Sequence, residues 1–331
     1  MTTFWFIVVA VLWTGFLFLE GFDFGVGALH GIVGRDDAGR REALHTIAPV
    51  WDGNEVWLIT AGAAMFAAFP GWYATAFSGL YPALVLLLMA LILRGVGIEF
   101  WGRRDSARWR RTWSWALVAS SLVAPLLVGV ALADFAYGLP IDDQQEFVGD
   151  FWDLVPLYSV VTGLAFVAIT LVHGAVFLSL KVHGELHRRA IRIARIVGPV
   201  AAVLVIAMTI WTHAVAGSGF LNLAELASLA AVLAAVWLVM TGRWGWAFVA
   251  TGVTIASMVL SIFTNLYPNV MVSSLNEANN LTVSNVASAP YSLKVMTVIV
   301  AIFLPGVLAY QAWTYHVLRR RLREPVAAQP H

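Results

Sequence analysis

The sequence contains no cysteine, which excludes disulfides, thiolate metal sites, iron–sulfur clusters and the covalent attachment of c-type haem. Charged residues are scarce as well. They make up 12% of the 331 residues, against about 25% in an ordinary soluble domain. The formal net charge is +1, so nothing favours a nucleic-acid partner. The phosphate-loop and H-E-x-x-H patterns are missing too, and no metal site is predicted.

Hydrophobic residues, in contrast, make up 60% of the chain, more than a water-soluble core of this length can hold. The first apolar run lacks a basic flank and a small-residue cleavage site, so it is expected to be a retained helix. The second stretch is the weakest of those long enough to span a bilayer. The pattern predicts an all-α, multi-pass inner-membrane protein with nine transmembrane helices, at about 4–24, 54–70, 73–98, 112–137, 157–181, 194–216, 222–241, 244–266 and 291–318.

Basic residues fall in every second loop, and such residues stay in the cytoplasm. On the opposite side Lys294 is the only basic residue in the loops, and the loop between helices 4 and 5 there is acidic. Alternation over nine spans therefore predicts an external N-terminus and a cytoplasmic C-terminus. The basic residues that set this orientation are Arg35, Arg40, Arg41, Arg103, Arg104, Arg108, Arg110, Arg111, Lys181, Arg188, Arg189, Arg192, Arg195, Arg243, Arg319, Arg320, Arg321 and Arg323.

The order of the helices suggests a duplication within one transmembrane domain, residues 1–323. Helices 1–4 (about 4–137) and 5–8 (about 157–266) would form two four-helix bundles, with helix 9 (about 291–318) peripheral. Each bundle opens with a helix followed by a basic loop, although two ordinary juxtamembrane loops explain that similarity equally well. Residues 324–331 are expected to form a cytoplasmic tail.

Ionisable side chains within a bilayer are costly and usually mark a path or a site. Glu20 and Asp23 are three residues apart, so they share one face in the inner half of helix 1. Two neighbouring carboxyl groups at that depth raise each other's proton affinity, which makes them candidate proton carriers. The alternative is a structural ion pair, with Arg94 or Glu99 at the inner end of helix 3 as partners.

Asp52 and Glu55 open helix 2 from the same side and are also three residues apart. An acid in the first turn of a helix can act simply as a cap, so that role stays open for Asp52. Trp51 and Trp57 flank this segment and are less easily explained as interfacial anchors than the other tryptophans.

His173 and His213 are the histidines embedded in helices, but their depths are poorly matched for a haem held by two histidines. Structural hydrogen bonding is expected for both. Asp134 and Glu225 fall near the outer surface and are expected to be solvated.

Two segments resemble a known family. Gly21-Phe22-Asp23-Phe24-Gly25-Val26-Gly27 resembles the G-F-D-x-G-V-G signature of subunit II of cytochrome bd quinol oxidase. The run from Ile47 to Leu58 resembles that family's A-P-x-W-D-G-N-x-V-W-L block. Phe77-Ser78-Gly79 and Gly184-Glu185-Leu186-His187 continue the match, so the resemblance covers nearly the whole chain.

The resemblance implies a subunit of a bacterial inner-membrane enzyme that oxidises quinol and reduces oxygen to water, taking protons from the cytoplasm. Haems b and d would lie in the partner, subunit I, and this chain can hold a structural quinone or phospholipid. A small accessory subunit is left open. By position, Asp23 and Asp52 match acids on the family's proton route, and Trp57 matches a tryptophan near its oxygen entry. Trp51 and Asn54 flank that position, on an oxygen path or at the subunit interface.

A proton-coupled secondary transporter is the alternative function. It predicts broken helices and matched acids in both halves of the chain. Glu20, Asp23, Asp52 and Glu55 all fall in the first half, which favours an accessory subunit with a partner.

Overall fold

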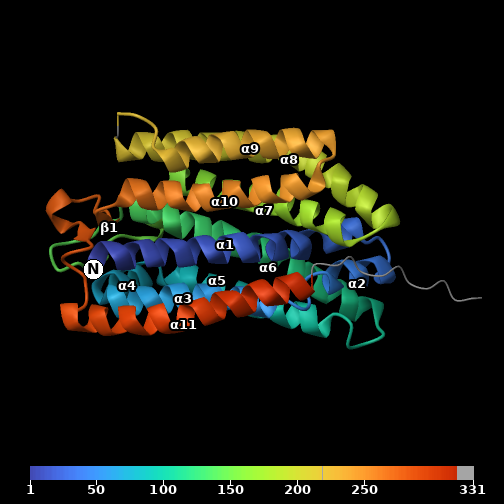
Figure 1. Cartoon of the computed structure of the whole chain (residues 1–331), viewed down its shortest axis with the longest axis horizontal. Helices are drawn as coiled ribbons and strands as arrows, with labels where there is room; N and C mark the ends of the chain where they lie inside the picture. The colour runs from blue at the N-terminus through green and yellow to red at the C-terminus, as the bar shows by residue number, and fades with distance from the viewer. Residues whose placement is uncertain (218, 319–331) are drawn as a thin grey trace, which may run out of the picture.

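The computed structural model describes residues 1–217 and 219–318 as an elongated bundle of helices that run along one common direction (Figure 1). Two short strands, β1 (Asn269–Met271) and β2 (Leu281–Thr282), pair antiparallel at one end of the bundle. The helices are α1 (Thr2–Val33), α2 (Asp37–His45), α3 (Trp51–Ala68), α4 (Pro70–Gly79), α5 (Tyr81–Phe100), α6 (Ala107–Tyr137), α7 (Leu157–Lys181), α8 (Gly184–Ala216), α9 (Leu223–Thr241), α10 (Trp244–Leu266) and α11 (Pro290–Val317), with the 3-10 turns η1 (Phe151–Leu154) and η2 (Glu277–Asn279).

The all-helical membrane architecture is confirmed. Within the described residues, eight helices are long and apolar enough to cross a membrane: α1 and α5 to α11. The span expected at 54–70 corresponds to α3, whose first turn is polar and which does not qualify on these criteria. The count of nine spans therefore stays a prediction.

The third expected span, 73–98, is wrong as a single helix. It breaks at Leu80 into α4 and α5. Pro82 lies at the start of α5, where its missing N–H and its ring prevent the preceding helix from continuing unbroken. The remaining helix, α5, still has 20 residues, or about 30 Å.

Several helices extend beyond the apolar stretch that predicts them. Helix α1 continues to Val33, and α8 begins at Gly184 rather than near residue 194. Hydropathy finds only the lipid-compatible part of a helix, whereas basic segments continue the same backbone hydrogen bonding. Asp23 therefore lies ten residues, about 15 Å, before the end of α1, deeper than a position at the end of a helix.

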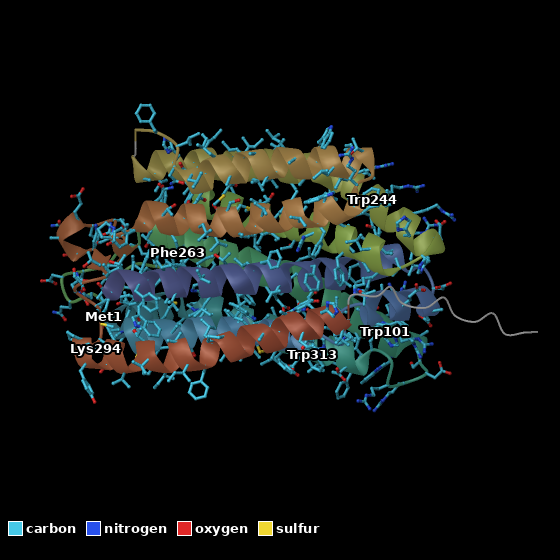
Figure 2. The ribbon with its side chains drawn as sticks, viewed as in Figure 1. Met1, Trp101, Trp244, Phe263, Lys294 and Trp313 are labelled. Carbon is cyan, nitrogen blue, oxygen red and sulfur yellow. The ribbon has the colours of Figure 1, made fainter. Side chains whose placement is uncertain are left out.

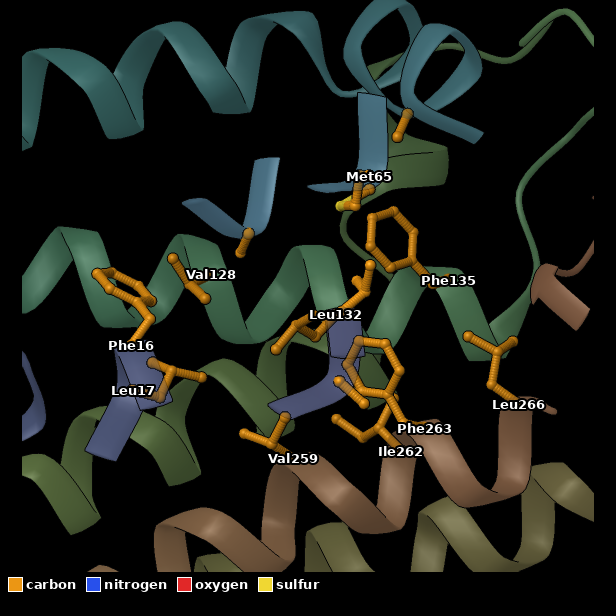
Figure 3. Packing of buried hydrophobic residues seen from close by; sticks show 14 of the residues in the cluster. Phe16, Leu17, Met65, Val128, Leu132, Phe135, Val259, Ile262, Phe263 and Leu266 are labelled. Carbon is orange, nitrogen blue, oxygen red and sulfur yellow. The ribbon is translucent and has the colours of Figure 1, made fainter. Parts of the chain in front are cut away.

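Helix α1 occupies the centre of the bundle, whereas α9 and α11 lie at its opposite edges (Figure 1). One hydrophobic core joins α1, α3, α6 and α10, with Phe16, Met65, Leu132 and Phe263 among its labelled members (Figure 3). Because this core includes helices from both halves of the sequence, the two halves pack as one body. Their division into two bundles stays a prediction.

The two ends of the bundle carry different segments of the chain. Met1 and Lys294 lie at one end, whereas Trp101 and Trp244 lie toward the other (Figure 2). At the first end the strands pack beside the loop after α6, where Leu139 N donates to Val272 O at 3.0 Å. The expected basic segment 319–323 and the expected tail 324–331 lie outside the described residues, as does residue 218.

Candidate functional site: a buried acid cluster

Arg94 of α5 is fully buried and forms ion pairs with two acids from different helices. Glu20 of α1, also fully buried, contacts the guanidinium through Oε1. Glu55 of α3 accepts from Arg94 Nη1 at 2.8 Å, and its side chain is 22% exposed. The guanidinium carbon also lies 4.8 Å from the ring centre of Phe24. The cation thereby ties α1, α3 and α5 together.

Asp23 belongs to the same cluster through an amide. Asn54 Nδ2 donates to Asp23 Oδ2 at 2.7 Å and to the Leu19 carbonyl at 3.3 Å. Both Asp23 and Asn54 are buried. On its other side, Asn54 Oδ1 accepts from the Tyr315 hydroxyl at 2.7 Å. Helix α11 therefore contributes to the site from a point 261 residues along the chain from Asn54.

Local sequence explains why these groups meet. Glu20 and Asp23 share a face of α1 because they are three residues apart, and the first turn of α3 packs against that face. Gly25 allows α1 to lie directly on α7, since a Cβ at that position would collide with the backbone of Gly174. The glycine after the acids thus lets this part of α1 lie close to α7.

The charges of the cluster do not balance. Glu20, Asp23 and Glu55 are three carboxyl groups, and Arg94 is the cation that the described residues place among them. Full ionisation would leave two negative charges uncompensated at low exposure, which is strongly unfavourable. Such a cluster is suited to exchanging protons with its surroundings, because binding a proton relieves the imbalance.

The predicted site residues divide into two groups. Glu20, Asp23, Glu55 and Asn54 converge, whereas Asp52 is exposed on the first turn of α3. No side-chain cap hydrogen bond begins α3, whose N-cap is Val50. Asp52 can still complement the helix dipole from the first turn.

The two predicted tryptophans lie on either side of the cluster. The Trp57 ring fills the space over Gly15 of α1, and its Nε1 donates to Gln311 Oε1 at 3.4 Å. The Trp51 ring packs over Gly95 of α5, where a Cβ would lie 3.1 Å from it. Each ring thus joins α3 to a neighbouring helix.

Three residues of the cluster were not among the predicted site residues. Arg94 entered only as a structural partner, although an arginine in an otherwise apolar helix is itself a signal for an intramembrane site. Tyr315 and Gln311 carry no comparable signal. They follow each other at helical spacing in a polar stretch near the end of α11, and only the fold brings them to Asn54.

The embedded histidines have other partners. His173 Nδ1 lies 2.7 Å from Thr251 Oγ1, and its ring stacks on Phe248 at 4.4 Å between centroids. Phe18 and Phe22 pack against the same ring. His213 Nδ1 lies 3.2 Å from Glu225 Oε2. His173 of α7 and His213 of α8 therefore contact different residues on different helices.

Two acids depart from expectation. Asp134 and Glu225 are buried, with relative exposures of 1% and 0%, so the expectation that they are solvated is wrong. Glu225 forms a capping box with Asn222 at the start of α9 and also accepts from Asn265 Nδ2 at 2.7 Å. Hydrogen bonds take the place of water there.

The fold and the site together define an all-helical integral membrane protein with a buried arginine–carboxyl cluster. The family model described as "Cytochrome bd terminal oxidase subunit II" matches residues 1–318. The chain belongs to this family, and it is a subunit of a terminal oxidase, an oxidoreductase of the bacterial inner membrane.

Known proteins of the family resemble it over almost their full length. The cytochrome bd ubiquinol oxidase subunit 2 of Bacillus subtilis (strain 168) is 41% identical over 332 residues, covering 97% of each chain. Its Escherichia coli (strain K12) counterpart, cytochrome bd-I ubiquinol oxidase subunit 2, is 32% identical, covering 99% of this chain and 97% of that protein. The structure of bd oxidase from Geobacillus thermodenitrificans shares the fold at a TM-score of 0.72 and 18% identity, covering 96% and 99% of the two chains.

Proposed function

We propose that this subunit supplies a cytoplasmic proton path to a haem-bearing partner, subunit I, within a complex that oxidises quinol and reduces oxygen to water. Family membership supports the oxidase reaction, and relatives named ubiquinol oxidases support quinol as the substrate class. The observation that carries the proton path is the unbalanced cluster of Glu20, Asp23 and Glu55 around Arg94.

Glu20 and Asp23 form the buried part of this proposed path, and Glu55 and Asp52 form the part that lies nearer the cytoplasm. Glu55 is partly exposed and Asp52 is exposed, which suits groups that exchange protons with water. Asn54 holds Asp23 by a hydrogen bond. In this assignment Arg94 keeps the buried carboxyl groups from being too costly to ionise.

The partner and cofactors follow from the same proposal. Haems b and d reside in subunit I, whose redox chemistry consumes the protons. Trp57, Trp51 and Asn54 line an oxygen path or the subunit interface. Membrane lipids, a structural quinone or a phospholipid, and a small accessory subunit complete the complex.

The expected topology agrees with this direction of proton uptake. With nine spans, an external N-terminus and a cytoplasmic C-terminus, the basic loops face the cytoplasm, and so do Asp52 and Glu55 at the start of α3. The polar first turn of α3 then lies at the cytoplasmic boundary, which explains why its hydropathy falls below that of the other spans. A proton-coupled transporter has no comparable support, because the relatives are oxidase subunits.

The experiment is the Asp23→Asn substitution in the intact oxidase. Oxygen consumption at saturating quinol should fall about tenfold or more, because the amide cannot take up a proton, while the haem spectrum of the complex persists. Asp23→Glu keeps a carboxyl group and should retain much more activity. Asp143→Asn, on an exposed outer loop, is the control and should match the wild type. Wild-type turnover of Asp23→Asn in a haem-replete complex would remove Asp23 from the path.

A further inference from the structure

A cavity of about 500 Å³ lies beside the acid cluster, at the end of the bundle that carries the loop between α2 and α3. It is lined by α1, α7, α10, α11 and that loop, and its members include Phe22, His45, Thr46, Phe177 and Phe248. A space of this size holds on the order of ten water molecules. None of the predicted proton-path acids lines it.

Two residues connect this cavity to the cluster. Tyr315 lines the cavity and donates its hydroxyl hydrogen to Asn54 Oδ1 at 2.7 Å. Leu19 also lines the cavity, and its carbonyl accepts from Asn54 Nδ2 at 3.3 Å. The Asn54 amide therefore lies one side chain away from the cavity, and Asp23 lies behind that amide.

Tyr315 also decides which way the Asn54 amide faces. An amide presents an acceptor on one side and two donors on the other. The Tyr315 hydroxyl donates to Oδ1, and Gln311 Nε2 approaches the same oxygen at 3.5 Å. With Oδ1 occupied by donors, Nδ2 points to Asp23. The reverse orientation would bring the amide oxygen to the carboxyl oxygen of Asp23 and the amide hydrogens to the tyrosine hydroxyl and Gln311.

We propose that this cavity is a water-filled entry from the cytoplasm to Asp23, and that Tyr315 is the positioning residue at its inner end. The inference rests on the proposed function and adds a route distinct from the one through Asp52 and Glu55. The proton is carried by water that enters through the cavity and reaches the Asp23 carboxylate beside the Asn54 amide, and the water that gives up the proton is left neutral. Tyr315 keeps its own proton throughout and acts by holding Asn54.

The charged groups around the cavity allow this role. Among the described residues, Lys181 and His45 are the ionisable side chains that line it besides Tyr315. Lys181 Nζ donates to the Leu318 carbonyl at 2.6 Å and lies 5.6 Å from the Phe177 ring, so it is engaged at the end of α11. His45 is exposed, at the end of α2.

The first test is Tyr315→Phe in the intact oxidase, assayed for oxygen consumption. Turnover at saturating quinol should fall about two- to tenfold, the effect of one lost hydrogen bond, while the KM for quinol and the haem spectrum stay unchanged. The double variant Tyr315→Phe/Asp23→Asn should be no slower than Asp23→Asn alone, because Tyr315 acts through Asp23. Tyr291→Phe, exposed at the opposite end of the same helix, is the matched control.

The second test narrows the cavity without touching the hydrogen bonds. Val317 lines it and is 54% exposed, so Val317→Trp adds volume at the cavity without disturbing the core. Turnover should fall severalfold, whereas Leu233→Trp on the exposed face of α9 should match the wild type. If Tyr315→Phe loses its haem, Val317→Trp alone decides, and wild-type turnover of that variant overturns the route.

The outcomes separate the two proposals. Slow Asp23→Asn with wild-type rates for Tyr315→Phe and Val317→Trp overturns the cavity route and leaves the proton path in place. A double variant whose loss is the product of the two single losses makes Tyr315 a structural residue that acts independently of Asp23. Wild-type turnover of Asp23→Asn in a haem-replete complex removes Asp23 from the proton path and overturns the cavity route together with it.

Discussion

Arg94 is the residue on which the arrangement of the acid cluster depends. It is fully buried between Glu20 and Glu55, and within the described residues it is the cation that pairs with both. Removing one member of a buried ion pair typically costs about 3–5 kcal/mol, because the other charge is left without compensation. Replacing both members by apolar residues of similar volume is often close to neutral.

The Arg94→Met substitution should therefore destabilise the subunit by about 3–5 kcal/mol. Adding Glu20→Met should recover a large part of that loss, since the pair is then replaced as a unit. Thermal unfolding of the purified complex in detergent measures both. A single variant as stable as the wild type, or a double variant no better than the single, would contradict the role given to the pair.

The sequence alone identified part of this site. Spacing correctly placed Glu20 and Asp23 on one face, because three-residue spacing is a property of the helix itself. It did not reveal that Tyr315 reaches Asn54, since that contact depends on where α11 packs. It misjudged Asp134 and Glu225 because proximity to a helix end does not show whether loops and neighbouring helices cover that end.

At the scale of helices, hydropathy predicted where apolar segments lie but not how they continue. The break at Leu80 follows from Pro82, whereas the extension of α1 to Val33 passes through Gly25, Gly27 and Gly31, residues that disfavour a helix when taken alone. From the sequence, Gly25 indicates only that another backbone can approach α1 closely at that position. Its partner, Gly174, is identified by the fold.

The Gly25→Ala substitution tests the close crossing of α1 and α7. A Cβ there would overlap the α7 backbone, which cannot move aside as a flexible side chain could, so a loss of about 1–3 kcal/mol is expected. Gly31→Ala in the same helix is the matched control. A Cβ at Gly31 meets nothing within 4 Å among the described residues, and alanine favours a helix by up to about 1 kcal/mol. Equal thermal stability of the two variants would show that the crossing is looser than the structure indicates.

At the scale of the molecule, α11 is the least buried of the candidate spans among the described residues. Only 6% of the most apolar 18-residue segment of this helix is buried. The helix has 28 residues and contributes Tyr315 and Gln311 to the cluster. Lipid or another subunit must cover the remainder in the membrane. Family membership implies a complex with subunit I, so the chain should depend on that partner.

Affinity purification of the chain from its native membrane, in mild detergent, tests that dependence. Haem absorbance should co-purify with the tagged chain and should disappear when subunit I is deleted, because the proposed function places the haems in subunit I. Without subunit I the apolar faces would lose their partner surface, and the yield of folded chain should fall. A chain that purifies alone in good yield, stable and without haem, would contradict this dependence on subunit I.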